Sequence, residues 1–386
     1  MYNFDKIVNR KNTNCYKWDS LTTKYEGIDD IIPMGIADMD FEVCDEIEKA
    51  LKERTNHPVY GYSNDVNKEL APVIYERYKN KGYDIELEDI LVATGVVYIV
   101  THIIRTFTKK GDKIVLPTPY YSPFGSVIES NERIILPCEM KLIDGIYKMD
   151  LASIENQIDE TTSMFIFCNP HNPTGRIFDK DEMLELIDFC QRHNLLIISD
   201  EIHSDFALTK PFYPIININK YAKDNTFTVS SCTKTFNLAG LKVAFCIISN
   251  PELKEKYNKA AIHTGLDSVN VFGIEAIKAA YSKSQKWEEE MLEYLKGNRE
   301  YVLNFFEEKL PKIKINPSEG TYLLWIDFTK SGKEVEKIQN ILINECRVEL
   351  NDGRMYGNHV GFGRMNLAMP RCYIIEACNR IYEVFK

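Results

Sequence analysis

The sequence lacks the short patterns by which metal sites, redox pairs and membrane segments are usually recognised. Its cysteines form no C-x-x-C pair and its histidines form no H-x-x-x-H pair, so the common spacings of zinc ligands and dithiols are missing. No apolar run is long enough to cross a membrane, and residues 1–18 contain no apolar signal core. We therefore expect no metal site, no membrane segment and no secretion signal.

The sequence also lacks a net positive charge. Its formal net charge is -10, which argues against nucleic acid or an anionic membrane as the main partner. The ten cysteines include Cys168 and Cys246, which lie inside apolar runs, where a free cysteine behaves as a small hydrophobic residue. A reducing, cytoplasmic compartment is therefore the expected setting.

The chain has the length and composition of a globular protein with more than one domain. It contains 386 residues, of which 44% are hydrophobic and 27% are charged, and a domain typically takes about 100–200 residues. The middle of the chain alternates short apolar runs with helical patterns, such as residues 96–108 and 180–193. The runs that we predict to be strands are residues 90–93, 113–116, 133–136, 164–168, 195–199, 226–230 and 243–248.

Short apolar runs of this kind are typical of strands buried on both faces of a sheet. Because helices separate them, we predict an α/β domain with a mostly parallel central sheet, right-handed crossovers and helices on both faces. We place this large domain at residues 41–284.

The C-terminal part has a different pattern and predicts a smaller α+β domain over residues 285–386. A long charged helix is expected first, followed by a turn and a strand. Two further helices follow, and residues 1–40 are expected to pack with this domain. The predicted elements are a helix at 286–309, a turn at 316–320, a strand at 322–327 and helices at 332–345 and 371–385.

Lys234 lies in the most informative stretch of the chain, residues 230–242. It stands among small hydroxyl residues, with a glycine six positions on and a second cation, Lys242, eight positions on. A lysine that bonds to an aldehyde cofactor needs such a setting, since small neighbours leave room and hydroxyls and cations hold a phosphate. A single Ser/Thr-Lys pair is more often a surface turn, so this interpretation depends on other segments.

Two motifs directly follow the first two predicted strands along the chain. In open α/β sheets, ligands bind beyond the carboxyl ends of the strands, which is where such motifs lie. Residues 94–97 open a helix whose free N–H groups can bind an anion; an ordinary strand–helix turn is the alternative. Tyr120 and Tyr121 follow the next strand. One of them can stack on a flat ring, with simple packing or exposure as the alternative.

Two more motifs follow later strands. Residues 169–175 contain two prolines and a glycine, which fix a rigid turn, and an asparagine there can donate to a ring oxygen. Asp200 can pair with a pyridinium nitrogen and so keep an electron-withdrawing ring protonated. His203, three positions on, could bond the ring oxygen. The alternatives are a helix N-cap for Asp200 and an ordinary polar contact for His203.

Arg364 lies between glycines and apolar residues in residues 361–368, which is unusual for a solvated charge. The planar fork of an arginine suits a substrate carboxylate. An interdomain salt bridge is the alternative.

Taken together, these motifs closely resemble the fold type I pyridoxal-phosphate enzymes of the aspartate aminotransferase superfamily, over nearly the whole chain. Residues 35–41, 200–205 and 234–241 resemble the bacterial cystathionine β-lyase or C–S lyase branch. That branch usually has an aromatic residue next to Ala37 and Asp38, whereas this chain has Gly35 and Ile36. Residues 241–242 also differ from its common pattern. The first departure affects which substrate side chain the site accepts, and the second affects how the phosphate is held.

The resemblance implies that pyridoxal 5′-phosphate is bonded to Lys234 and that its ring nitrogen pairs with Asp200. It also implies Tyr121 stacked on the ring, Asn172 at the phenolic oxygen, and His203 where many relatives have a tyrosine. The residues implied around the phosphate are Gly95, Val96, Val97, Ser231 and Lys242, joined by Tyr62 from the neighbouring subunit of a homodimer with composite sites. The residues implied around the substrate are Arg364 at the α-carboxylate, Asn172 and Ala37.

The function that the resemblance implies is a cytoplasmic β-lyase for a small sulfur amino acid such as L-cystathionine. Lys234 would act as the general base, and Tyr121 would assist proton transfer. One alternative is an aminotransferase that uses the same Lys234, Asp200 and Arg364. The other is a cofactor-binding regulatory protein without turnover, against which the intact site residues argue.

Overall fold

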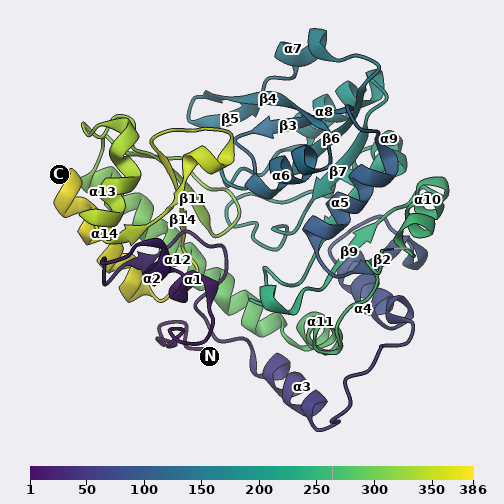
Figure 1. Ribbon diagram of the computed structural model, residues 1–386, viewed down its shortest axis with the longest axis horizontal. Helices are drawn as coiled ribbons and strands as arrows, with labels where there is room; N and C mark the ends of the chain where they lie inside the picture. The colour runs from purple at the N-terminus through teal and green to yellow at the C-terminus, as the bar shows by residue number, and fades with distance from the viewer. Residues whose placement is uncertain (263) are drawn as a thin grey trace.

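The central sheet of the larger part of the protein is formed by strands from the middle of the chain. The computed structural model describes residues 1–262 and 264–386, and within them this sheet has eight strands (Figure 1). Their spatial order is β2 (Ile90–Ala93), β9 (Ala244–Ile247), β8 (Thr226–Ser230), β7 (Leu196–Asp200), β6 (Thr162–Cys168), β3 (Lys113–Thr118), β4 (Ile134–Ile143) and β5 (Ile146–Met149). The run from β8 to β4 is parallel, β9 is antiparallel to both of its neighbours, and β5 is antiparallel to β4.

Both faces of this sheet are buried. Side chains alternate between the faces along each strand, so that Phe165 and Phe167 join one hydrophobic cluster while Met164 and Ile166 join another. The helices that pack on the second cluster are α5 (Val96–Phe107), α6 (Ser122–Ser130) and α10 (Pro251–Ala261). Those on the first are α3 (Asp45–Thr55), α4 (Val66–Asn80), α8 (Lys180–Arg192), α9 (Lys220–Asn225) and α11 (Val271–Lys283). The predicted α/β sheet with helices on both faces is confirmed.

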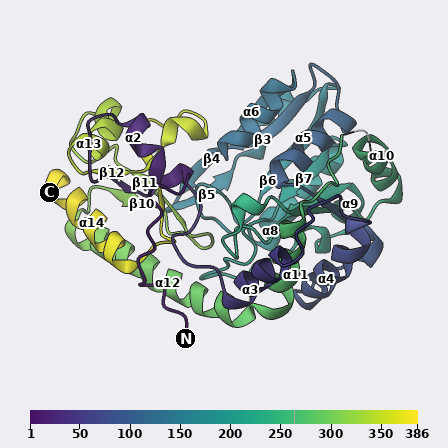
Figure 2. The same ribbon diagram turned by 60° about the horizontal axis from the view of Figure 1, so that its bottom comes forward.

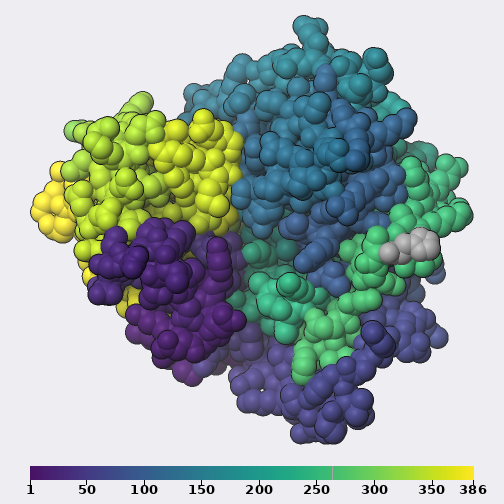
Figure 3. Space-filling model, viewed as in Figure 1, coloured from purple at the N-terminus to yellow at the C-terminus, as the bar shows by residue number. Residues whose placement is uncertain are grey.

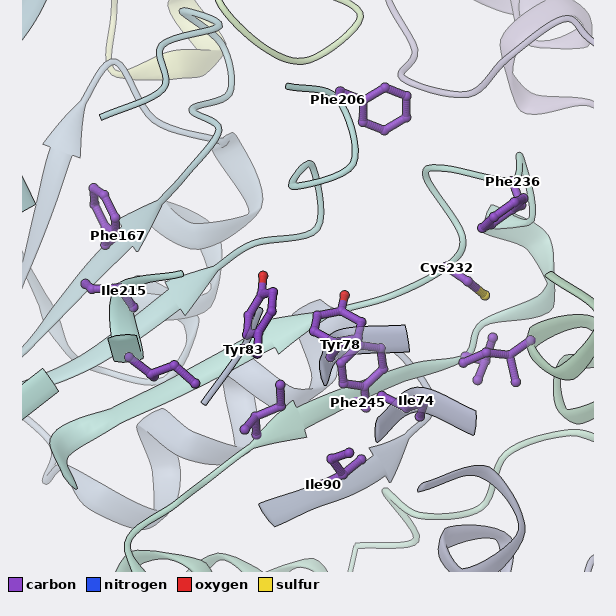
Figure 4. Packing of buried hydrophobic residues seen from close by; sticks show 14 of the residues in the cluster. Ile74, Tyr78, Tyr83, Ile90, Phe167, Phe206, Ile215, Cys232, Phe236 and Phe245 are labelled. Carbon is purple, nitrogen blue, oxygen red and sulfur yellow. The ribbon is translucent and has the colours of Figure 1, made fainter. Parts of the chain in front are cut away.

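Aromatic rings fill the cluster that lies under α4. Tyr78 packs edge-on against Phe245 and Tyr83, with ring centroids 5.0 Å and 4.7 Å away, as Figure 4 shows. Edge-to-face packing of this kind is favourable beyond the area that it buries. It fixes α4 against the antiparallel edge of the sheet.

The smaller part has the predicted α+β character, and its strands form one antiparallel sheet that helices cover. The strand order is β10 (Lys314–Ile315), β11 (Leu323–Asp327), β14 (Phe362–Asn366) and β13 (Asn351–Asp352). Its helices are α12 (Gln285–Lys309), α13 (Ile338–Asn344) and α14 (Arg371–Phe385). Figures 1 and 2 show α12 running from the larger part, near α11, to the smaller part beside α14. None of the helices in residues 1–262 and 264–386 has the length and apolar character needed to cross a membrane.

Two local predictions need correction. The helix predicted over residues 332–345 begins later, because Gly332 has φ of +87° and only a 3-10 turn at Val335–Lys337 precedes α13. The strand β5 was missed altogether. Asp144 and Gly145 have φ of 51° and 78°, so they form the Asp-Gly type of hairpin turn that joins β4 to β5. The Asp-Gly pair in the sequence was a signal for this hairpin.

The N-terminal segment packs on the smaller part, as Figure 3 shows by the contact of the purple and yellow surfaces. It contains the short helices α1 (Tyr16–Asp19) and α2 (Leu21–Lys24), and its strand β1 (Ile32–Pro33) pairs in parallel with β12 (Val348–Glu349). We propose the division into residues 1–40, 41–284 and 285–386 on this basis; these bounds stay a prediction.

A buried ion pair fixes the N-terminal segment where it crosses between the two parts. Lys17 Nζ lies 2.7 Å from Asp40 Oδ2, and both side chains are almost fully buried. Trp18 Nε1 and Arg10 Nη1 donate to Asp40 Oδ1 at 2.9 Å and 2.7 Å. Burial opposes the ionisation of Asp40, yet Lys17 and these donors hold the pKa of Asp40 below its usual value. The carboxylate is therefore ionised and depends on its partners.

We predict that Lys17→Met destabilises the protein. Removing one partner of a buried pair leaves an uncompensated charge, and because Arg10 and Trp18 remain, the cost should be on the order of 3 kcal/mol. Denaturant titration should show this loss of stability as a lower unfolding midpoint for Lys17→Met. The folded-state pKa of Asp40 is depressed, so its contribution is present above the unfolded pKa and lost as pH falls. The gap between wild type and variant should therefore shrink in acid.

Lys68→Met is the matched control, because Lys68 is exposed on α4. The free energy of unfolding of this variant should stay within about 0.5 kcal/mol of the wild-type value. Equal midpoints for wild type and Lys17→Met at neutral pH would show that the buried pair contributes nothing.

Candidate active site

A cavity of about 230 Å³ lies at the carboxyl ends of the parallel strands β6, β7 and β8. It is closed on one side by Ala37 from the N-terminal segment. The sequence-predicted residues that line it are Ala37, Gly95, Val96, Val97, Tyr121, Asn172, Asp200, His203, Ser231, Lys234 and Lys242. The structure thus brings together residues from six separate segments, most of which follow strands of the sheet, as the strand-end rule predicts.

Lys234 follows β8 in a loop and points its amine into this cavity. Its Nζ donates a hydrogen bond of 2.5 Å to the backbone oxygen of Ala37. Burial lowers the pKa of Lys234 to about 8, and the positive charge of Arg364 acts in the same direction, against Asp38 and Asp200. A much larger fraction of this amine is therefore neutral near pH 7 than for an ordinary lysine.

Asp200 is the last residue of β7 and is almost fully buried. Its Oδ1 accepts from the backbone N–H of Ile202 at 3.1 Å. Burial raises the pKa of Asp200 to about 7, opposed by this hydrogen bond and by Lys234. Residues 202–205 form turns, and no helix follows Asp200 directly, so the N-cap interpretation of Asp200 is wrong. A buried carboxyl with a raised pKa needs a cationic partner to ionise fully.

The opposite end of the cavity is rich in donors. Gly95 lies directly before α5, so the first N–H groups of this helix, which have no partner within the helix, face the cavity. Ser231 is buried, and its Oγ shares a hydrogen bond of 2.7 Å with Thr233. Lys242 has φ of 47°, a conformation that is rare for non-glycine residues, and its Nζ lies 6.0 Å from the ring centre of Tyr98.

Arg364 lies on β14 of the smaller part and is buried beside the cavity. Its Nη1 donates to Asn172 Oδ1 at 3.0 Å, and its Nη2 donates to the Gly35 oxygen at 2.7 Å. Nε has no hydrogen-bond partner among the described residues. A guanidinium has five N–H donors, so this one keeps donors for a further acceptor. The ring of Tyr356 lies against it, 5.2 Å from its central carbon.

His203 and Tyr121 lie on two sides of the cavity. The Nδ1 atom of His203 is buried and has no partner in the part of the chain that the structure describes. Burial, with Lys234 and Arg364, lowers the pKa of His203 well below its usual value, so the imidazole is neutral. Tyr121 packs edge-on against Phe124, with ring centroids 5.4 Å apart, which fixes its orientation. The ordinary-contact interpretation of His203 leaves its Nδ1 unexplained.

Tyr322 was not predicted by the sequence analysis, yet its hydroxyl reaches the site. It donates to the Ala37 oxygen at 3.1 Å. Tyr98 and Cys168 also line the cavity. Cys168 ends the predicted strand at 164–168, so the strand-end rule could have found it, whereas no local signal marks Tyr322.

Tyr322 reaches the site because the turn at residues 316–320 docks on the larger part. The N–H groups of Glu319 and Gly320 both donate to the Gly175 oxygen at 2.8 Å. The N–H group of Thr321 donates to the Phe206 oxygen at 3.1 Å. A side chain at position 320 would collide with the backbone of Phe206. The turn predicted from the sequence therefore connects the smaller part to two loops of the site.

Tyr62 does not lie at this cavity in the single chain. Its side chain is fully exposed, beside a separate groove of about 820 Å³. Among the described residues there is no group of three or more histidine, cysteine or acidic side chains placed to hold a metal ion.

The protein was compared with known families and structures. Residues 29–381 match the family model described as aminotransferase class I and II. The chain is 34% identical over 382 residues to cystathionine beta-lyase PatB of Bacillus subtilis (strain 168), covering 98% of each chain. It is 32% identical over 377 residues to protein MalY of Escherichia coli (strain K12), covering 96% of this chain and 95% of MalY.

The crystal structure of cystalysin from Treponema denticola, which contains a pyridoxal 5′-phosphate cofactor, has the same fold. The TM-score is 0.94 at 31% identity, covering 100% of this chain and 98% of cystalysin. These matches extend over almost the whole chain. The protein therefore belongs to the aminotransferase class I and II family, in the branch that contains the cystathionine β-lyases and C–S lyases.

Proposed function

We propose that the protein is a pyridoxal 5′-phosphate-dependent carbon–sulfur β-lyase. Its substrate would be L-cystathionine or a related cysteine S-conjugate, and with one water the products would be a thiol, pyruvate and ammonia. The observation that carries this proposal is a buried lysine with a lowered pKa beside a buried carboxyl, in a cavity with a donor-rich end. The names of the relatives, cystathionine beta-lyase and cystalysin, support the same reaction.

The residues of the cavity fit the cofactor. Asp200 would pair with the ring nitrogen, whose positive charge is the partner that its raised pKa lacks. Asn172 and the unpartnered Nδ1 of His203 would bond the ring oxygen, and Tyr121 would cover the ring. The residues proposed to hold the phosphate are Gly95, Val96, Val97, Ser231 and Lys242.

Lys234 would act as the general base. When bound, the cofactor supplies an aldehyde that joins the substrate amine and a ring that accepts the electron pair of the broken Cα–H bond. The freed amine of Lys234 would take the α-proton, and its pKa of about 8 lies close to the value that general-base catalysis near neutral pH requires. The Ala37 carbonyl would hold the amine of Lys234 while it is free of the cofactor, and Tyr121 would assist proton transfer to the amine or the leaving sulfur.

Arg364 would bind the substrate α-carboxylate through the donors that Asn172 and Gly35 leave free. A bidentate pair would fix the amino acid so that its α-hydrogen faces Lys234. Ala37, Asn172 and Arg364 would together form the substrate side of the cavity.

We further propose a cytoplasmic homodimer in which Tyr62 reaches the phosphate of the neighbouring subunit. Tyr60, Tyr62 and Ile262 are large, exposed and close to one groove, and exposed apolar patches of this kind mark interaction surfaces. The cytoplasmic setting is supported by the cysteines, all ten of which are free in the described residues.

We predict that the protein releases pyruvate continuously from L-cystathionine when no keto acid is added. A lyase regenerates its cofactor in each cycle, whereas an aminotransferase stops after one turnover without an acceptor. Lys234→Ala should lower the rate by at least about 100-fold, because the general base is lost. Coupled assays of pyruvate and thiol formation measure both.

Lys242 and the helix N-terminus remain in Lys234→Ala, so this variant should still bind the cofactor, and absorbance titration checks that it does. A single burst of keto acid from the wild type would favour the aminotransferase. Full cofactor binding with no turnover on a panel of amino acids would favour a regulatory protein.

We predict that Arg364→Lys raises the KM for L-cystathionine and lowers kcat. The ammonium keeps the charge but loses the planar fork, so both the affinity for the carboxylate and the orientation of the α-hydrogen are lost. A reduction of kcat/KM by about 10- to 100-fold corresponds to roughly 1.4–2.8 kcal/mol. Steady-state kinetics measures the change.

The cofactor absorption spectrum is the internal control, since Arg364 should not contact the cofactor. Lys180→Arg, at the exposed first position of α8, is the matched charge-conserving control. Unchanged kcat/KM in Arg364→Lys would assign the residue to a structural role, and Arg371 would be the next candidate.

We predict that Tyr62→Phe weakens cofactor binding without unfolding the chain. Loss of one hydrogen bond to a charged group costs about 1.5–3 kcal/mol, or roughly 10- to 150-fold in affinity. Mixed dimers of Tyr62→Phe and Lys234→Ala subunits give the decisive measurement. One site of each mixed dimer should carry both defects and the other neither, so half of the sites should work normally.

A mixed dimer without a near-wild-type site would contradict a contribution across the interface. Tyr60→Phe, in the same exposed segment, is the control for general effects on the groove.

A further inference from the structure

The backbone oxygen of Ala37 accepts two hydrogen bonds from different parts of the protein. Lys234 Nζ donates at 2.5 Å and the hydroxyl of Tyr322 donates at 3.1 Å. A carbonyl oxygen has two lone pairs and can accept both. The side chain of a buried tyrosine and the amine of the proposed base are therefore joined through one atom.

Tyr322 is held at this position on every side. It directly precedes β11, and its side chain is about 1% exposed. Its ring packs edge-on against Phe206 at 4.9 Å and against His203 at 5.8 Å, measured between centroids. The backbone bond from Thr321 to Phe206 fixes the chain just before it. The hydroxyl has little freedom to leave the Ala37 oxygen.

We propose that Tyr322 is a positioning residue for Lys234. The Tyr322 hydroxyl makes the Ala37 oxygen a weaker hydrogen-bond partner for the charged ammonium of Lys234. The hydrogen of the hydroxyl is the positive end of the O–H dipole and faces the same oxygen as the ammonium. The second bond also withdraws electron density from that oxygen. Both effects disfavour the charged form of Lys234. The inference deepens the proposed function, because it rests on Lys234 as the base.

The other charges around this pair do not change when the hydroxyl is removed. The groups that act on Lys234 or on Tyr322 are Asp38 from the N-terminal segment, Tyr121, Asp200, His203 and Arg364. Asp38 and Asp200 favour the ammonium, and Arg364 opposes it. Burial raises the pKa of Tyr322 far above its usual value, so the hydroxyl remains a donor throughout the working pH range.

Removal of the Tyr322 hydroxyl should raise the pKa of Lys234. Without the hydroxyl, the Ala37 oxygen bonds the ammonium alone, so the charged form gains and the pKa of Lys234 rises. The loss of one neutral hydrogen bond should raise the pKa of Lys234 by roughly 0.4–1. The acid limb of the pH–rate profile, along which Lys234 loses its proton, should move to higher pH by the same amount.

The test compares wild type with Tyr322→Phe, which removes the hydroxyl and keeps the ring. In cofactor-free full-length protein, the rate of Lys234 acetylation by acetic anhydride is followed against pH by peptide mass spectrometry. The midpoint should rise by roughly 0.4–1 pH unit. In the holoenzyme, the acid limb of kcat should shift in the same direction with KM nearly unchanged. A midpoint that stays in place or falls overturns the proposal.

Two further variants separate this role from general packing. Tyr257→Phe removes the hydroxyl of another buried tyrosine, one without a hydrogen-bond partner in residues 1–262 and 264–386, and should leave the midpoint unchanged. Tyr322→Leu removes ring and hydroxyl and should show at least the shift of Tyr322→Phe. A shift in the leucine variant alone would assign the effect to the ring and contradict the proposal.

The labelling experiment does not depend on lyase activity, so the two proposals can fail separately. A shifted midpoint in a protein that makes no pyruvate from L-cystathionine would reject the lyase and keep the link between Tyr322 and Lys234. Pyruvate formation with an unshifted midpoint would do the reverse.

Discussion

The need to satisfy the backbone oxygens of residues 35–39 determines how the parts of this protein meet. Buried carbonyl groups must find donors, and here the donors come from distant elements. The Gly35 oxygen accepts from Arg364, the Ala37 oxygen from Lys234 and Tyr322, and the oxygens of residues 36 and 38 from Asn366. One short segment thus fixes β14, the start of β11 and the loop after β8 relative to each other. The cavity exists because this segment closes it.

That closure brings charged groups together in a buried space. Lys234, Asp200 and Arg364 lie around one cavity, and burial moves the pKa values of the first two toward neutrality from opposite sides. Each shift favours the uncharged form of its group, which is the expected result where desolvation exceeds the attraction between partners. Shifts of this size cluster at sites that transfer protons. The site is therefore suited to proton transfer, although the burial of Lys234 and Asp200 disfavours their charged forms.

The sequence was sufficient for features that depend on local pattern and strand order. The strands β2 and β8 and the helix α14 have the predicted bounds, and parallel strands that end at one edge necessarily bring Asp200 and Lys234 together. The β4–β5 hairpin was missed although the Asp144–Gly145 pair is a local signal for it. The role of the turn at 316–320 was missed because it depends on contacts between distant segments. Tyr322 was missed for the same reason, since nothing near it in the sequence indicates that it reaches Ala37. The roles of individual residues and the domain bounds stay predictions.

The departure from the C–S lyase branch at Gly35 is matched by a close contact within this chain. A side chain at position 35 would meet the amide oxygen of Asn351, so the aromatic residue typical of the branch would require the Asn351 side chain to move. Asn351 is the cross-strand neighbour of Arg364, and its Nδ2 donates to the hydroxyl of Tyr356 at 2.9 Å. The ring of Tyr356 in turn lies against the guanidinium of Arg364, where a cation is attracted to the ring face. The wall behind the proposed carboxylate site is thus supplied by the smaller part and not by residue 35. Because that wall belongs to β13 and β14, the placement of the proposed carboxylate site depends on how the smaller part docks as well as on the groups that face the cavity.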